Sequence, residues 1–478
     1  MGGALAEWAL GGDMKLWSIR ALALGTALAT VLAVPSFGMS LRDAVQLSLT
    51  SNPEIGAAVQ NQQAVEFELR QALGLYAPRV DLEGSVGVQR LDTPSRRAAG
   101  LDDDALVPAQ IALVATFDLF DGGYRDAGVD RQAARIDSAS FRVLERSEFI
   151  ALQIARVYYQ VVLQQRILGL SQENVRFHES MLQDVASSIE SGQLTESDRL
   201  QVIERLAAAK ARVTEAAVAL EAARIEFELF VGSQPSSVGM PPHPGAALPR
   251  TLQAAMEVAR INSPVARIAE ADIDAAAALV RQAESAFAPK VQFEARGATG
   301  YDIGGSAGIT NDFSARLSLR WNIFDGGVRE AQVQEEIRRE SEAMYNHAQA
   351  YREVDEAVKT SWLQLQTQGT LASTYRDQLN ASANLIAAYR EQFGVGERSL
   401  LDVLDAQNTR VNVQMLQETA AFGVSFAEYR LLAATGSLLR FMGLEAPSGA
   451  YARAAFNVEP GNVSDPADRK PLDLTFKP

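Results

Sequence analysis

Apolar and polar residues alternate with a period of two in four segments of the chain, which places the apolar residues of each segment on one face of a strand. The apolar faces are formed by Val80, Leu82, Gly84, Val86 and Val88; by Ile111, Leu113, Ala115, Phe117 and Leu119; by Val291, Phe293 and Ala295; and by Phe313, Ala315, Leu317, Leu319, Trp321 and Ile323. The opposite faces carry full charges at Asp81, Glu83, Asp118, Glu294, Arg296, Arg316 and Arg320. The pattern predicts four antiparallel strands in two hairpins.

Two interpretations of these hairpins are open. In the first, they belong to a soluble sheet whose apolar face covers a core. In the second, they insert into a membrane, because each has about the 9–11 residues that a tilted membrane strand needs and a charged face that suits a water-filled lumen. Aromatic residues gather where the hairpins begin and end, as at a membrane interface: Tyr76, Phe117, Phe120, Phe287, Trp321 and Phe324. Four strands cannot close a barrel, and an open edge in lipid leaves backbone groups unpaired at several kcal/mol each, so other copies must complete it.

A long segment without proline and nearly without glycine follows each hairpin. These segments predict helices from Tyr124 to about Glu190 and from Val328 to about Phe393. At 1.5 Å per residue, each helix spans roughly 100 Å. Glycine turns at Gly192 and at Gly394 and Gly396 connect them to shorter return helices, expected at about Glu196 to Phe230 and about Ser399 to Phe441. A helix pair precedes each hairpin and is broken before Pro53 or Pro264, because a residue before proline disfavours the α region.

The whole arrangement occurs twice. Tyr-Ala-Pro-Arg-Val at 76–80 recurs as Phe-Ala-Pro-Lys-Val at 287–291, and Phe-Asp-Gly-Gly at 120–123 recurs at 324–327. The first pair of motifs is offset by 211 positions (289 − 78) and the second by 204 (325 − 121), so seven extra residues lie between Pro78 and Asp121. Insertions concentrate in surface loops, which predicts a loop over 92–104. We therefore expect a tandem repeat with halves at 39–235 and 251–444, a linker at 236–250 and an extended tail at 445–478.

The N-terminal residues resemble a targeting segment. A basic start at Met14-Lys15 precedes an apolar run from Ala21 to Val34 that ends in small residues. This is the pattern of a secretory signal peptide, expected over 1–38 with an upstream extension before Met14.

Composition narrows the function further. The net charge of −15 and the absence of a basic stripe disfavour a nucleic-acid partner. The chain has no cysteine, and its three histidines lie outside any metal-ligand motif, so we expect no metal and no cofactor. No nucleophile elbow, phosphate loop or catalytic cluster is present in the sequence, which makes an enzyme the least favoured class.

The repeated order of helix, hairpin, Phe-Asp-Gly-Gly and long helical hairpin resembles the TolC-like outer-membrane factors. The resemblance covers roughly Leu41 to Leu444, and its most specific part is the stretch from Gln392 to Gln407, which is similar to the family's periplasmic entrance turn. It implies a mixed fold of α and membrane β structure, in which four strands per chain contribute to a twelve-stranded barrel of a homotrimer. It also implies a helical tunnel in the periplasm of a Gram-negative bacterium, outer-membrane lipid around the barrel, and partnership with a periplasmic adaptor and an inner-membrane transporter.

The resemblance also implies gate residues. Asp402 and Asp405 match aspartates that form acidic rings at the closed tunnel end, Arg398 matches a gating arginine, and Ser197 and Asp198 match its partners in the first repeat. Phe393 departs from the resemblance, since a member of the family has a tyrosine at this place and phenylalanine cannot donate a hydrogen bond.

A structural role is equally open for several of these residues. Ser399 to Asp402 and Thr195 to Asp198 have the pattern of a capping box at a helix start. Arg398 is also compatible with a solvated turn residue. Asp405 lies too far into its helix to act as a cap, so it is the stronger candidate for a pore residue.

Three functions remain open on the sequence. The first is an export duct for type I protein secretion with an ABC-type transporter, which the Leu41-Arg42-Asp43-Ala44-Val45 opening and the end of the first half favour within the family. The second is a drug or metal efflux duct of the same architecture. The third is a periplasmic structural coiled coil, which would need no membrane strands.

Overall fold

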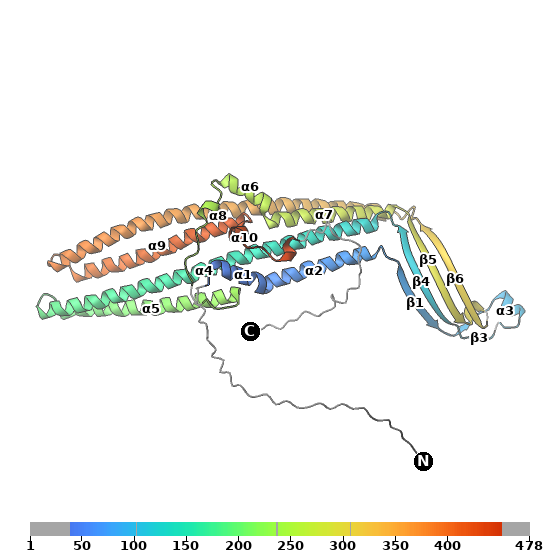
Figure 1. Ribbon diagram of the computed structural model, residues 1–478, viewed down its shortest axis with the longest axis horizontal. Helices are drawn as coiled ribbons and strands as arrows, with labels where there is room; N and C mark the ends of the chain where they lie inside the picture. The colour runs from blue at the N-terminus through green and yellow to red at the C-terminus, as the bar shows by residue number, and fades with distance from the viewer. Residues whose placement is uncertain (1–38, 102, 236–237, 306, 452–478) are drawn as a thin grey trace, which may run out of the picture. The chain divides into compact units, whose positions relative to one another are not determined.

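The computed structural model describes residues 39–451 except 102, 236–237 and 306. The expected signal peptide at 1–38 lies outside these residues, as do residues 452–478 of the tail expected at 445–478, so both stay predictions there. The first residues of that tail include the short 3₁₀ helix Ser448–Tyr451. Each half of the described chain contains the same series of main elements, namely two helices, a hairpin, a long helix and a return helix (Figure 1). The first half comprises α1 (Leu41–Ser51), α2 (Pro53–Gly74), β1 (Arg79–Val86), β2 (Gln89–Arg90), α3 (Pro94–Ala98), β3 (Ala105–Leu106), β4 (Ala109–Phe120), α4 (Tyr124–Glu190) and α5 (Glu196–Val231).

The second half repeats the main elements in the same order after a short 3₁₀ turn, without equivalents of β2, α3 and β3. It comprises η1 (Gly245–Ala247), α6 (Leu252–Asn262), α7 (Pro264–Glu284), η2 (Ser285–Phe287), β5 (Lys290–Tyr301), η3 (Ile303–Gly305), β6 (Ile309–Arg320), α8 (Val328–Gly394), α9 (Leu400–Ala434), α10 (Leu438–Phe441) and η4 (Ser448–Tyr451). The two long helices have 67 residues each, and their bounds match the predicted ones. The breaks before Pro53 and Pro264 are also confirmed, with both prolines at the first turn of a helix, where no amide hydrogen is needed.

The four main strands form one antiparallel sheet in the order β1-β4-β5-β6. Residue pairing within the two hairpins is equivalent: Arg79 faces Thr116 in the first, and Lys290 faces Arg320 in the second. These pairs are related by the same offsets of 211 and 204 that the motifs gave (290 − 79 and 320 − 116). The duplication read from the sequence is therefore present strand for strand.

Strand lengths differ from the prediction. β1 has 8 residues, whereas β4, β5 and β6 have 12 each. β1 ends before Val88, because its partner strand begins after Pro108, which has no amide hydrogen to donate. Trp321 and Ile323 follow β6 rather than belonging to it, and the Trp321 indole donates instead to the Phe287 carbonyl oxygen at 3.0 Å.

The predicted loop over 92–104 is partly ordered. It contains α3, and the short strands β2 and β3 pair beside it. Arg96 of α3 is buried and donates to the Gly305 carbonyl oxygen at 2.8 Å, so the first hairpin's long connection is tied to the second hairpin's turn. The segment that holds the seven extra residues is thus ordered in part by the Arg96–Gly305 contact, which the local sequence does not predict.

The second return helix was predicted too long. α9 ends at Ala434, and Gly436 adopts a φ of 63° before α10 begins. A Cβ at Gly436 would lie 2.7 Å from the Asn262 carbonyl oxygen, so the break is shaped by the packing of α6 against this turn.

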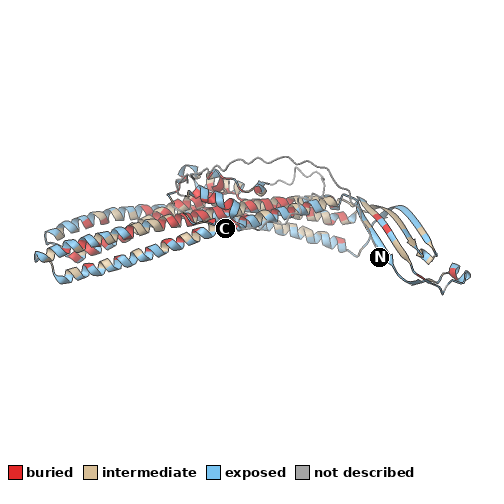
Figure 2. Ribbon diagram, turned by 60° about the horizontal axis from the view of Figure 1, so that its bottom comes forward, coloured by how far each residue is buried: buried red, intermediate tan, exposed pale blue. Residues whose placement is uncertain are grey.

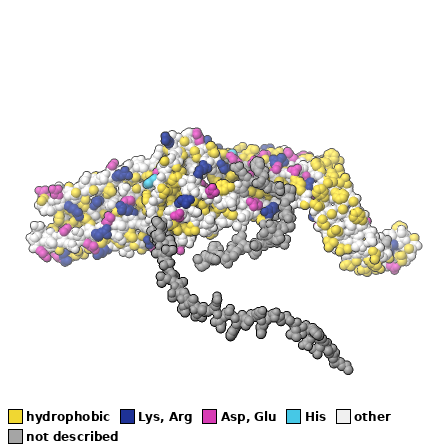
Figure 3. All heavy atoms as spheres, in the orientation of Figure 1, with side chains coloured by type: hydrophobic (Ala, Val, Ile, Leu, Met, Phe, Trp, Pro, Cys, Tyr) yellow, Lys and Arg dark blue, Asp and Glu magenta, His cyan; other side chains and the backbone are white. Residues whose placement is uncertain are grey.

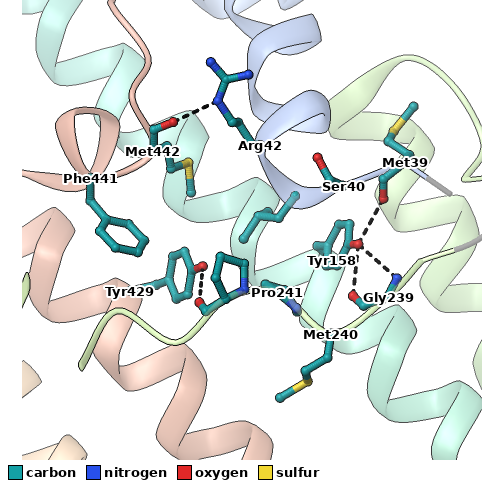
Figure 4. A pocket seen from close by; sticks show the side chains of 12 residues that line it. Met39, Ser40, Arg42, Tyr158, Gly239, Met240, Pro241, Tyr429, Phe441 and Met442 are labelled. Atoms are coloured by element: carbon teal, nitrogen blue, oxygen red, sulfur yellow. Dashed lines mark hydrogen bonds between the residues drawn. The ribbon is translucent and has the colours of Figure 1, made fainter. Parts of the chain in front are cut away.

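The main core lies midway along the helices, where α1, α4, α5, α9 and α10 meet (Figure 2). Two tyrosines of this core hold the linker between the halves (Figure 4). The Tyr158 hydroxyl bonds the carbonyl oxygens of Met39 at 2.9 Å and Gly239 at 3.0 Å, and the Tyr429 hydroxyl donates to Pro242 at 2.8 Å. A cavity of about 470 Å³ lies between these groups. Through the helices that the structure describes, no stretch is both long and apolar enough to cross a membrane.

Candidate functional site

The seven charged residues predicted for a lumen share one face of the sheet. In register, Asp81 faces Val114 and Val114 faces Arg296, while Thr116 faces Glu294 and Glu294 faces Arg316. Side chains on this face bond across the strands: Arg316 donates to Glu294 at 2.6 Å, and Gln292 donates to Asp118 at 2.9 Å. Within the described chain, Glu83 and Arg320 form no such bond. The face is therefore polar, and only some of its charges are paired across the strands.

The other face of the sheet is apolar and exposed. Hydrophobic side chains cover the strands, whereas charged side chains are scattered over the helices (Figure 3). Leu82 is 70% exposed, Phe313 82% and Leu317 65%. Exposed apolar surface on this scale marks an interaction with protein or membrane. Aromatic residues at the helix end of the sheet, among them Phe120, Phe287 and Trp321, are also partly exposed.

A buried ion pair joins each hairpin to its long helix, and sequence reasoning missed both pairs. Arg125 donates to Asp121 at 2.7 Å, and Arg329 donates to Asp325 at 2.7 Å. The two arginines are 204 positions apart, and each is the second residue after a Phe-Asp-Gly-Gly motif. This repetition in the sequence could have marked both arginines as structurally important.

Arg329 makes further contacts besides its ion pair with Asp325. Arg329 also donates to the carbonyl oxygens of Asn322 at 2.7 Å and Ala286 at 3.1 Å, and its guanidinium lies 5.0 Å from the Phe287 ring centroid. It thus fastens the end of β6 and the segment before β5 to the first turn of α8. Charge-assisted bonds of this kind are among the stronger ones in proteins.

The far ends of the helical hairpins carry the predicted entrance turns. Gly192 and Gly396 adopt φ values of 75° and 82°, a region that glycine enters at little cost. Gly394 instead ends α8 with ordinary helical geometry. The two ends pack together through an apolar cluster of Met181, Val185, Val202, Leu400, Val403 and Leu404, with Phe393 partly buried against it.

Both predicted capping boxes are present. The Asp402 carboxylate accepts from the Ser399 backbone N–H at 3.3 Å, and the Ser399 hydroxyl accepts from the Asp402 N–H at 3.2 Å. In the first repeat, the Asp198 carboxylate accepts from the Thr195 N–H at 2.9 Å. Both aspartates therefore stabilise the start of a return helix, whatever else they do.

Arg398 and Asp405 make different contacts in the chain. The Arg398 guanidinium lies over the Tyr389 ring at 4.3 Å, donates to Gln392 at 3.1 Å and approaches Asp402 at 3.9 Å. Ser197 and Asp198 are not among its contacts in the described chain. Asp405 accepts a hydrogen bond from Arg205 of α5 at 3.2 Å, a partner that sequence reasoning missed.

A comparison with known families decides the identity of this architecture. The model of the outer membrane efflux protein family matches residues 44–233 and 255–437, which is once in each half. The chain belongs to the outer membrane efflux protein family. Members of this family are outer-membrane channels of Gram-negative bacteria rather than enzymes, and they form trimers that work with periplasmic adaptors and inner-membrane transporters. The interpretation of the hairpins as membrane strands is thereby confirmed, and the soluble sheet and the periplasmic coiled coil are excluded.

Individual relatives agree with this assignment. The chain is 24% identical over 368 residues to the outer membrane efflux protein BepC of Brucella suis, covering 77% of this chain and 79% of BepC. It is 23% identical over 397 residues to the alkaline protease secretion protein AprF of Pseudomonas aeruginosa, covering 80% and 81%. The fold is similar to that of CusC, with a TM-score of 0.72 at 16% identity over 83% of this chain and 92% of CusC. It is also similar to the open state of the Neisseria gonorrhoeae channel MtrE, with a TM-score of 0.69 at 17% identity over 84% and 90%.

Proposed function

We propose that this family member is the outer-membrane duct of a type I protein secretion system, fed by an ABC-type transporter through a periplasmic adaptor. The observation that favours this role is the likeness to AprF, a protein named for the secretion of a protease, over four fifths of both chains. The runner-up is a drug or metal efflux duct, which the equally distant likeness to BepC supports.

Two measurements separate these functions. Crosslinking in cells followed by mass spectrometry identifies the inner-membrane protein that copurifies with the channel, and an ABC transporter is the expected result. Deletion of the gene then abolishes the export of a protein while leaving drug and metal tolerance unchanged. A proton-driven pump as partner, together with raised drug or metal sensitivity, would favour the efflux duct instead.

The proposal extends to the periplasmic entrance. We assign it to the turns around Gly192 and Gly396 and to Asp198, Ser197, Phe393, Arg398, Asp402 and Asp405 near them. The support is that both turns lie at the same end of the helices, where one apolar cluster packs them together. In a threefold tube each Asp405 becomes one of three carboxylates, and like charges at one constriction attract multivalent cations.

Cation block of the channel tests this assignment. Trivalent cations added from the periplasmic side of planar bilayers should reduce the single-channel current. Block that is unchanged in the double variant Asp402→Ala, Asp405→Ala would show that these side chains do not line the constriction.

The halves at 39–235 and 251–444 are proposed as the two structural repeats of this duct, since the family model matches once within each.

A further inference from the structure

A cavity of about 350 Å³ opens where four helices of the chain meet. α7 begins at Pro264 and α9 ends at Ala434, and both helices pack against α4 and against α8. The end of α9 reaches the start of α7, since a Cβ on Gly436 would lie 2.7 Å from the Asn262 carbonyl oxygen. Neither helix fills the space at this junction, where small alanine side chains of α8 and α9 form part of the lining. The cavity is large enough for a small molecule, since such sites occupy about 300–1,000 Å³.

The lining combines apolar side chains with carboxyl groups. Apolar contacts are offered by Leu152 of α4, Val265 of α7 and Val354 of α8. The charged residues are Glu145 and Glu148 of α4, Glu353 of α8 and Arg430 of α9. Three carboxyl groups thus accompany one guanidinium, and that guanidinium already donates to Gln364 at 2.6 Å. The balance of charge favours a cation over an anion.

Glu148 is the most deeply buried of these carboxyl groups. It is only 7% exposed, and one of its oxygens accepts from the Leu439 backbone N–H at 3.3 Å. The second oxygen has no partner among the described residues. Buried polar atoms of native proteins are nearly always bonded to protein, water or an ion, because an unbonded one costs free energy. A hydrogen-bond donor held in the adjoining cavity would supply the missing bond.

The duplication does not account for this carboxyl group. The repeat equivalent of Glu148 is Arg352 (148 + 204), an exposed residue of α8. α10, which Glu148 contacts at its first turn, has no counterpart among the described elements of the first half. At Gly232, the equivalent of Gly436, a Cβ would meet no neighbour within 4 Å. Glu148 therefore belongs to this one junction and is not a by-product of the repeat.

We propose that the cavity binds a small organic cation, with an ammonium group carried on an apolar body. The ammonium group donates to the second oxygen of Glu148, in a charge-assisted bond of the stronger kind. The more exposed Glu145 and Glu353 add negative potential, and the apolar body lies against the aliphatic side chains of the lining. The site lies within one chain, so the proposal does not depend on which transporter or cargo the duct serves.

A metal ion fits this cavity less well than an organic cation. The described residues include no group of three or more His, Cys, Asp or Glu side chains that could hold a metal. Much of the lining is apolar, which gives a hydrated ion few partners and an organic cation a surface to cover. Because the ligand would touch α4, α7, α8 and α9 together, its binding should also raise the thermal midpoint of unfolding.

Two probes of nearly the same shape test the proposal. 2-Phenylethylamine carries an ammonium group on an apolar body, and 2-phenylethanol is its neutral counterpart. Calorimetric titration of the detergent-solubilised, full-length protein measures the Kd of each, with injections into detergent alone subtracted. At pH 8 the amine is still protonated, and the pH lies above the pKa of about 7 that burial gives Glu148. The amine should bind at least about tenfold more tightly than the alcohol.

The variant Glu148→Gln isolates the contribution of the charge. It replaces the buried carboxyl group by an amide of nearly the same shape, so the protein should still fold, which its thermal midpoint and its elution on a sizing column verify. The tenfold preference for the amine over the alcohol should disappear. Glu173→Gln is the matched control, because Glu173 is an exposed residue of the same helix outside the cavity, and the preference should be retained.

The variant Ala357→Leu tests the place of binding. Ala357 lines the cavity, so a larger side chain there should weaken the binding of both probes. Ala348→Leu, at an exposed position of α8 outside the lining, is the control and should bind both probes as the parent does. Equal affinity for amine and alcohol, no binding of the amine, or an unchanged preference in Glu148→Gln would overturn the proposal. Binding of full strength in Ala357→Leu would overturn it as well, and none of these results bears on the proposed role in secretion.

Discussion

Arg205 on α5 donates a hydrogen bond to Asp405 on α9 at 3.2 Å, and this ion pair joins the two helical hairpins near their turns. The Asp405 side chain is 57% exposed and that of Arg205 35%. Ion pairs this exposed contribute about 0–1 kcal/mol to stability. The pair therefore adds little to holding the hairpins together, and its larger effect would be on the electric field at the proposed entrance.

Replacing Asp405 by alanine should weaken the block of the channel by trivalent cations severalfold. Each subunit loses one carboxylate from the proposed constriction, and the attraction for a multivalent cation falls with it. Single-channel conductance with a titration of the cation measures the effect. Asp377→Ala, which removes an exposed carboxylate elsewhere on α8, is the control and should leave the block unchanged.

Replacing Arg205 by alanine should have the opposite effect. It removes the cation that partly neutralises Asp405, so the block should become stronger while stability changes by no more than about 1 kcal/mol. Arg212→Ala is a matched control, because Arg212 lies on the same helix and bonds the neutral Asn412 at 3.3 Å. A weaker block in Arg205→Ala would mean that Asp405 faces away from the conduction path.

The long elements could be predicted from the sequence because local signals mark both of their ends. α4 begins after Gly122-Gly123 and ends before Gly192, and no proline lies between these glycines. The capping boxes at Thr195 and Ser399 were readable for the same reason, since each involves residues only three positions apart. The equivalent pairing of strands in the two hairpins followed from the offsets between the repeats, because no single strand segment indicates its partner.

The missed features depend on contacts between distant segments. Arg205 meets Asp405 only because α5 and α9 approach each other, and its own repeat equivalent is Thr409. The end of α9 depends on Asn262, which lies beside Gly436 in space and far from it in sequence. Arg125 and Arg329 were overlooked because an arginine in the first turn of an exposed helix is ordinary, and only the fold buries these two.

Replacing Arg329 by lysine should destabilise the channel although the charge is retained. Lysine cannot reproduce the forked contacts with Asp325 and two backbone carbonyl oxygens, nor the planar stacking on Phe287. The thermal midpoint of the detergent-solubilised protein should fall by several degrees. Arg339→Lys on the exposed surface of α8, where the partner is Glu335, should leave the midpoint nearly unchanged. Equal midpoints for the two variants would contradict a structural role for the Arg329 cluster.

The buried carboxyl of Glu148 should make the stability of the protein depend on pH. Glu148 on α4 is only 7% exposed and accepts from the Leu439 backbone N–H at 3.3 Å, while its second oxygen has no partner among the described residues. Burial raises the pKa of Glu148 from 4.5 to about 7, although two backbone N–H groups and Arg440 oppose the shift. Glu145, Glu353 and Arg430 line the cavity beside it.

The sign follows from which state holds the proton. Between pH 4.5 and about 7 the folded chain keeps Glu148 protonated while the unfolded chain ionises, so stability should fall as the pH rises through this range and then level off. This difference in pKa between the folded and unfolded chain corresponds to roughly 3 kcal/mol per chain. Glu148→Gln should remove this slope and unfold at a higher temperature than the parent at pH 8, with little difference at pH 4.5. Thermal unfolding across this pH range measures the slope, and Glu145→Gln, at a partly exposed position, is the control. Parallel curves for the parent and Glu148→Gln would rule out Glu148 as the titrating group.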